Sequence, residues 1–287
     1  MNIIPLVVST IGHAAWDNVL HWMIVNDPDA SVLHMHWLRT CIIWVFLFIS
    51  NRHKEPVTKP IMWWMWFSLT GWTIPTLAYT TCVMLTGYRI SISFQPFIPL
   101  FVALNIGAPL KGRRLAALNF ALLGTLCVWI WAPWYHKNDI ELWKIWISVV
   151  CAFLHIASLS IWFVMLNSVD KNHLATITRG VGISILTLFF GMVVWTPQHL
   201  FSTFMIRWDM WLIIICLAAA AAAAKQWVIA YCSTIMSADA VAIFECLHPI
   251  ATLCCDVIMR EDVFEYEDIL TISFFAIGWI LYPKTNI

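Results

Sequence analysis

Long apolar stretches, separated by short polar connectors, run the whole length of the chain. Each stretch is close to the ~20 residues that a helix needs to cross the hydrocarbon core of a bilayer. The connectors carry charges and turn residues, and none is long enough to form a soluble domain. The pattern predicts ten membrane-spanning helices, over residues 3–24, 32–50, 61–84, 90–110, 115–133, 142–166, 174–196, 208–235, 238–259 and 269–283.

The second half of the chain repeats the first. The segment Phe94–Pro99, which reads Phe-Gln-Pro-Phe-Ile-Pro, returns as Phe-Glu-Cys-Leu-His-Pro over Phe244–Pro249. Paired repeats in a membrane are typical of alternating-access carriers, whose binding site lies between the two halves. Because each half would have an odd number of spans, the halves should insert with opposite orientation. We expect one all-α membrane domain made of two inverted five-helix repeats, residues 1–138 and 139–287.

The composition indicates that lipid surrounds most of the chain, and it argues against several classes of protein. The chain is 61% hydrophobic and only 11% charged, with a mean hydropathy of +0.80, so most of it must be surrounded by lipid. A formal net charge of zero argues against a nucleic-acid partner. The nine cysteines show no spacing typical of a disulfide framework or a zinc ribbon. No glycine-rich ATP-binding loop occurs, which argues against direct ATP drive, and we expect no cofactor.

The charges of the connectors predict the orientation. Connectors on the side of the N-terminus hold most of the lysine and arginine, whereas the opposite connectors hold few of these and many carboxylates. By the positive-inside rule both termini should be cytosolic. The sequence leaves the choice of membrane open, and we favour the plasma membrane.

These features together resemble the drug/metabolite transporter superfamily, and within it the EamA-like members. An arginine stands early in the second span of each half (Arg39, Arg179), and a proline interrupts spans four and nine (Pro96, Pro249). The charged turn Arg260-Glu261 is similar to the glycine–glutamate turn usual in that family. The resemblance implies a carrier with a central cavity lined by spans from both halves, including the fourth and ninth.

Span nine carries the strongest set of polar residues inside an apolar stretch. Glu245, His248 and Asp256 recur at helical spacing, which puts them along one face. Gln95 occupies the position of Glu245 in span four. A charge at mid-membrane depth costs ~2.5–3.5 kcal/mol on insertion scales, so it is kept where it pairs or lines a water-filled path. We expect Glu245 and Gln95 to face each other and hold the substrate, with Glu245 or His248 able to take up a proton.

Lys225 ends an unbroken run of alanines, Ala218–Ala224, whose smooth surface allows neighbouring helices to approach closely. It is therefore expected deep in the protein, either as the partner of Glu245 or as a contact for an anionic group. If it only neutralises Glu245, the pair would serve helix packing alone. Arg39 and Arg179 are interpreted as structural charges near span ends, where a guanidinium can reach the interface or backbone carbonyls.

Span one holds His13, Asp17 and His21 at successive i, i+4 steps of a helix. Such a ladder can supply ligands to a metal ion or relay protons. The alternative is packing, with Asp17 paired to Arg39 of span two. Among the 19 tryptophans, most lie near span ends, where an interfacial belt explains them. Trp16, beside Asp17, is the first candidate for a cavity wall.

The candidate residues mix carboxylate, histidine and lysine with aromatic walls. That mixture suits a polar or zwitterionic solute with an apolar part better than a phosphate or nucleotide. We expect a secondary transporter, not an enzyme, that moves a small organic metabolite of amino-acid or amine size by alternating access, with proton coupling as a hypothesis. The alternatives are a metal-ion carrier that uses the span-one ladder and a membrane-embedded metalloenzyme. The expected partners are the solute, protons and lipid, and both a monomer and a homodimer stay open.

Overall fold

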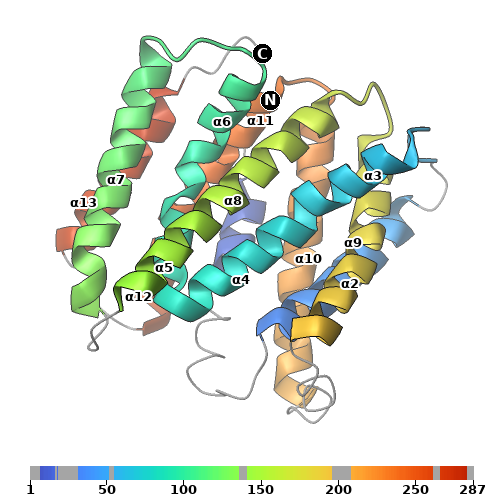
Figure 1. Cartoon of the computed structure of the whole chain (residues 1–287), viewed down its shortest axis with the longest axis horizontal. Helices are drawn as coiled ribbons and strands as arrows, with labels where there is room; N and C mark the ends of the chain where they lie inside the picture. Colours follow the sequence, from blue (N-terminus) through green and yellow to red (C-terminus); the bar gives the residue numbers. More distant parts are fainter. Residues whose placement is uncertain are drawn as a thin grey trace.

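The computed structural model describes residues 7–16, 18, 32–51, 55–135, 141–195, 208–260 and 266–282. Within these ranges the chain is helical and contains no strand, which confirms the all-α class. Residues 7–16 form the first helix. The helices that follow are α2 (Val32–Asn51), α3 (Ile61–Ser68), α4 (Ile74–Thr86), α5 (Tyr88–Ser93), α6 (Ile98–Asn105), α7 (Arg113–Tyr135), α8 (Leu142–Asn167), α9 (His173–Trp195), α10 (Trp208–Cys232), α11 (Ala238–Ala242), α12 (Leu247–Arg260) and α13 (Tyr266–Leu281) (Figure 1).

The repeated Phe-x-x-x-x-Pro segments form two breaks in otherwise helical spans. A 3₁₀ turn, η2 (Gln95–Phe97), joins α5 to α6, and a second one, η5 (Ile243–Cys246), joins α11 to α12. Proline lacks the N–H that continues an α-helix and its ring crowds the preceding turn, so Pro96 and Pro99 account for the first break and Pro249 for the second. The two turns pack against each other, and the Cys246 thiol donates a weak hydrogen bond to the Pro96 carbonyl oxygen at 3.6 Å.

A third break has a different geometry. A π-turn, η1 (Leu69–Thr73), joins α3 to α4 and contains Gly71. A Cβ atom at Gly71 would lie 2.5 Å from Cδ1 of Trp162, so only glycine allows η1 to approach α8 this closely. The π-turn and the missing side chain together bring α4 against α8 over most of its length.

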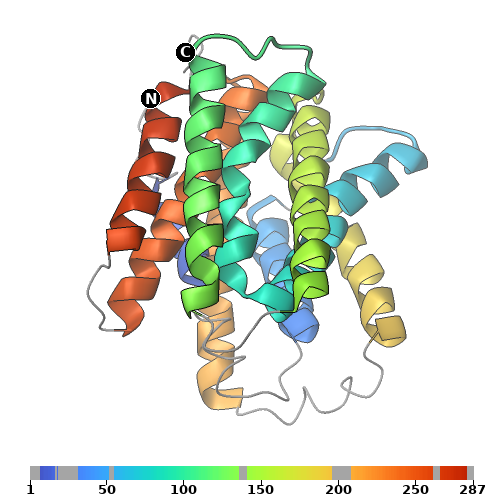
Figure 2. The same ribbon diagram turned by 60° about the vertical axis from the view of Figure 1, so that its left-hand side comes forward.

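Long helices pack in pairs around these breaks. Helix α7 lies along α13, and α2 packs against both α9 and α10 (Figures 1 and 2). The α7–α13 contact is close, because a Cβ atom at Gly124 would lie 2.5 Å from Cε1 of Phe275. Large apolar side chains are fully buried between the helices, among them Phe67, Ile98 and Ile156.

The surface and the interior have the polarity expected of a membrane protein. Large apolar side chains face outward, with Ile61 80% and Val194 79% exposed, whereas Glu245 and Lys225 are buried. A soluble monomer rarely exposes this much apolar surface. Six helical stretches are long and apolar enough to cross a membrane: Leu33–Asn51, Arg113–Ile130, Leu142–Asn167, His173–Val194, Ile215–Cys232 and Ala238–Ile258. The other expected spans coincide with residues 7–16, α3–α4, α5–α6 and α13, and the number of crossings stays a prediction.

Candidate functional site

A polar cavity lies where the helix breaks meet α2, α4, α8 and α10. Its volume is about 140 Å³, several times the roughly 30 Å³ that one water molecule occupies in the liquid. The described residues that line it are His13, His36, Arg39, Thr40, Ile43, Gly71, Trp72, Pro75, Thr76, Tyr79, Gln95, His155, Leu159, Trp162, Phe163, Ala222, Lys225, Gln226, Ile229, Glu245 and His248.

Regular helical spacing brings the aromatic wall together. His155, Leu159 and Trp162 follow one another at four and three positions along α8, so they share one face. Trp72 and Tyr79, seven positions apart along η1 and α4, form the facing surface. The rings of Trp72 and Trp162 meet edge-on, with their centroids 5.2 Å apart. One side of the cavity is therefore mainly aromatic.

A buried ion pair forms the polar side. Lys225 Nζ lies 2.9 Å from Glu245 Oε2, and the two residues are 5% and 7% exposed. Lys225 comes from α10 and Glu245 from η5, so the pair joins a long helix to a helix break. The predicted partnership of Lys225 with Glu245 is thus observed, and both residues also line the cavity. The alanine run before Lys225 permits this depth: a Cβ atom at Gly12 would lie 2.8 Å from Ala221 Cβ, so the first helix packs directly on α10.

Gln95 lines the same cavity from η2, and η2 contacts η5, which carries Glu245. Its side chain is 5% exposed, and its Oε1 atom has no hydrogen-bond partner among the described residues. A buried carbonyl oxygen without a partner costs about 1–3 kcal/mol. Gln95 therefore brings to the cavity wall an acceptor that no described residue uses.

His13 and His248 also line the cavity, with their rings perpendicular and 4.9 Å apart. Arg39 Nη2 lies 2.6 Å from His13 Nδ1. A guanidinium has no acceptor, so Arg39 donates and Nδ1 accepts, which means that the His13 ring is neutral with its proton on Nε2. Protonation of Nδ1 would break this contact.

Arg39 departs from its expected role. The sequence predicts Arg39 near the end of a span, where its guanidinium would reach the interface. In the structure Arg39 is buried, with 7% of its surface exposed, and it lines the cavity. Its guanidinium also lies over the Trp16 ring, 5.1 Å from the centroid. Trp16 is buried behind the lining and does not form the wall, contrary to expectation. Arg179, its counterpart in the sequence repeat, is exposed on α9 and stacks on Trp64 at 4.5 Å, consistent with a structural role.

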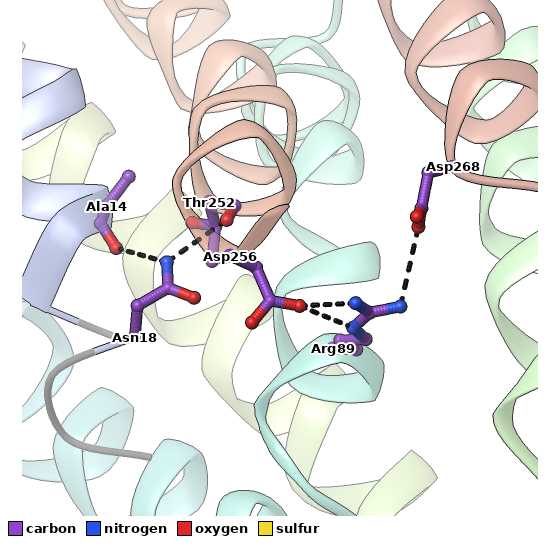
Figure 3. A network of polar contacts seen from close by, with 6 residues as sticks. All are labelled: Ala14, Asn18, Arg89, Thr252, Asp256 and Asp268. Carbon is purple, nitrogen blue, oxygen red and sulfur yellow. Dashed lines mark hydrogen bonds and ion pairs between the residues drawn. The ribbon is translucent and has the colours of Figure 1, made fainter. Parts of the chain in front are cut away.

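Asp256 is likewise not a cavity residue. It belongs to a polar network at one end of the bundle, where Arg89 of α5 binds both Asp256 of α12 and Asp268 of α13 (Figure 3). Asp256 lies two helical turns beyond His248, so it shares the helical face but is too far along the axis to reach the cavity. In the same network Asn18 Nδ2 donates to the Thr252 carbonyl oxygen at 3.0 Å, joining the first helix to α12.

The metal hypothesis receives no support from the described residues. No three His, Cys, Asp or Glu side chains lie close enough to hold a metal ion within the ranges that the structure describes. Asp17 and His21, two members of the span-one ladder, lie outside those ranges.

Several lining residues were not expected from the sequence, notably His36, His155 and Gln226. Two signals could have found some of them. His36 stands three positions before Arg39, on the same face of α2, and His155 occupies nearly the repeat position of His13. Nothing in the sequence marks Gln226.

The sequence matches no protein-family model and no curated protein sequence. The likeness to the EamA-like transporters therefore rests on the residues quoted for it in the sequence.

Proposed function

We propose that the chain is a secondary transporter with the inverted-repeat architecture of the EamA-like drug/metabolite transporters, and that it moves a small polar or zwitterionic organic solute. The observation that carries the proposal is the central cavity, in which two helix breaks meet around a buried ion pair. Broken helices that meet at a shared site are the usual construction of secondary carriers.

The helix pairing supports two halves related by a twofold axis. When two repeats are related by a twofold axis, residues at equivalent positions touch only close to that axis. Pro96 and Cys246 are equivalent in the repeated segments and are hydrogen-bonded. The pairs α2–α9 and α7–α13 follow the same rule, because each joins the corresponding spans, second or fifth, of the two halves.

The ion pairs at the ends of the bundle support the same symmetry. Arg114 at the start of α7 lies 2.9 Å from Asp239 at the start of α11. Arg89, at the start of α5, binds Asp268, at the start of α13. Asp239 follows Arg89 by 150 positions, the offset of the repeated segments, and Arg114 and Asp268 each stand immediately before the expected fifth span of their half. The two pairs therefore correspond with their charges exchanged. They lie at opposite ends of the bundle (Figure 1). Alternating access would require the two ends to open in turn.

The orientation follows from the connectors. Those on one side of the bundle, at the top of Figure 1, carry Lys59, Lys111 and Lys171. We assign this side to the cytosol by the positive-inside rule, which agrees with cytosolic termini. The plasma membrane remains the favoured location.

The size and lining of the cavity favour a small organic solute over a metal ion. A space of about 140 Å³ with aromatic and ionic walls fits a metabolite of amino-acid size. Proton uptake by Glu245, His13 or His248 would couple transport to a proton gradient. A metal-ion carrier lacks a described cluster of ligands in its favour.

Solute exchange in proteoliposomes tests the proposal. Proteoliposomes that contain the purified protein are loaded with a mixture of unlabelled metabolites. Single labelled solutes are then added outside, and their uptake by counterflow is measured. Glu245→Ala should abolish the exchange, whereas Glu141→Ala, which removes an exposed carboxylate outside the bundle, should leave it unchanged. Equal exchange by wild type and Glu245→Ala would contradict the assignment of the cavity.

A further inference from the structure

The two members of the cavity ion pair are held by separate elements. Lys225 reaches in from α10 and Glu245 is part of η5, and in the cavity their charged atoms are 2.9 Å apart. The lysine ammonium ends a flexible four-carbon stem and can swing away without moving its helix. The pair can therefore open toward a solute while both backbones stay in place.

Charge balance restricts which solutes can open it. A buried ion that loses its partner is strongly unfavourable, because little water is present to replace the partner. A simple anion that replaced Glu245 beside Lys225 would leave the Glu245 carboxylate without its partner, and a simple amine that replaced Lys225 would leave the ammonium without its partner. A zwitterion exchanges one ion pair for two, since its carboxylate binds Lys225 and its ammonium binds Glu245. All four charges then stay compensated.

The closeness of the pair restricts the solute further. Lys225 Nζ and Glu245 Oε2 start in contact, so a solute with adjacent charges needs the pair to widen little. Widely separated charges would need a wide opening. The ammonium has three donors, and Gln95 Oε1 is an acceptor without a partner among the described residues of the same cavity. A second ammonium N–H can satisfy it.

We propose that the substrate is an α-amino acid, whose ammonium and carboxylate are separated by a single carbon atom, and that it binds by exchanging partners with the Lys225–Glu245 pair. This rests on the proposed transport function and assigns its substrate class. The side chain of the solute would lie against Trp72 and Trp162. The cavity volume of about 140 Å³ suits a neutral side chain of moderate size, as in leucine.

Four related compounds test this class by thermal shift and by counterflow on the full-length protein. L-leucine is compared with 6-aminohexanoate, an isomer with distant charges, with 4-methylpentanoate, which lacks the ammonium, and with 3-methylbutylamine, which lacks the carboxylate. Leucine alone should raise the melting temperature and exchange. Binding of any of the other three as tightly as leucine would overturn the proposal.

Variants of the pair provide the second arm. Lys225→Met and Glu245→Gln should each lower leucine affinity by about 100-fold or more. The double variant lacks both charges of the pair, so no buried ion is left without a partner and the protein should stay folded. It should nevertheless fail to bind leucine. Leucine binding by the folded double variant would overturn the proposal. If only solutes that are not α-amino acids exchange, the substrate class is wrong and the transport function stands; if no solute exchanges, both fail.

Discussion

Gln95 is buried in the cavity wall with a carbonyl oxygen that no described residue satisfies. An apolar side chain at this position would make the fold more stable, because an unpaired buried acceptor costs about 1–3 kcal/mol. The same holds for the Lys225–Glu245 pair, since apolar residues of similar volume often replace a buried ion pair without loss of stability. At the residue scale, the cavity is thus built of groups whose retention is better explained by binding than by folding.

Gln95→Met tests this interpretation by separating stability from activity. Methionine keeps the length of the side chain and removes the unpaired acceptor, so the free energy of unfolding should stay the same or rise by roughly 1 kcal/mol. Exchange of the transported solute should fall at least tenfold, because the acceptor is lost. The melting temperature in detergent and counterflow in proteoliposomes measure the two effects. A less stable variant with normal flux would point to a packing role.

At the scale of elements, the cavity depends on how closely the π-turn η1 approaches α8. The Trp162 ring fills the space beside Gly71 and is held there by Phe67, Trp72 and Phe163, whose rings all contact it. The ring cannot move aside without disturbing the aromatic wall. The absence of a side chain at Gly71 therefore shapes the cavity.

Gly71→Ala should destabilise the protein and reduce flux together. Its Cβ atom would lie 2.5 Å from Trp162, and overpacking of this kind costs about 1–3 kcal/mol. Gly191→Ala is the matched control, because the nearest atom to its Cβ, Leu77 Cδ2, is 3.9 Å away. Alanine favours a helix over glycine by roughly 0.5–1 kcal/mol, so the control should be neutral or more stable. Similar melting temperatures for the two variants would refute the clash.

At the scale of the whole molecule, one ion-pair cluster joins the helices at each end of the bundle, but the clusters are unequal. Arg114 binds a single buried carboxylate, Asp239, whereas Arg89 binds both Asp256 and Asp268 (Figure 3). Each cluster joins spans from both proposed halves, so each can hold its end closed. The difference in composition predicts a difference in strength.

Arg89→Met should be more destabilising than Arg114→Met. Loss of Arg114 leaves Asp239 buried without its cation, at a cost of about 3 kcal/mol. Loss of Arg89 removes the cation shared by two buried carboxylates, which then also repel each other. Thermal unfolding of both variants measures the order. Asp239→Asn should restore part of the stability of Arg114→Met, with a coupling of roughly 0.5–3 kcal/mol, and strict additivity would show that the pair contributes nothing.

The sequence by itself determined the lipid-facing character, the helical class and the position of two helix breaks, because hydropathy, span length and proline act locally. It also marked Glu245, Gln95, His248, His13 and Lys225, since polar groups in an apolar stretch are conspicuous. Only the tertiary structure decided that Arg39 lines the cavity while Arg179 is exposed, and that Asp256 pairs with Arg89 at one end of the bundle. A charge in a span needs a partner, and which helix supplies that partner depends on contacts between segments far apart in the chain.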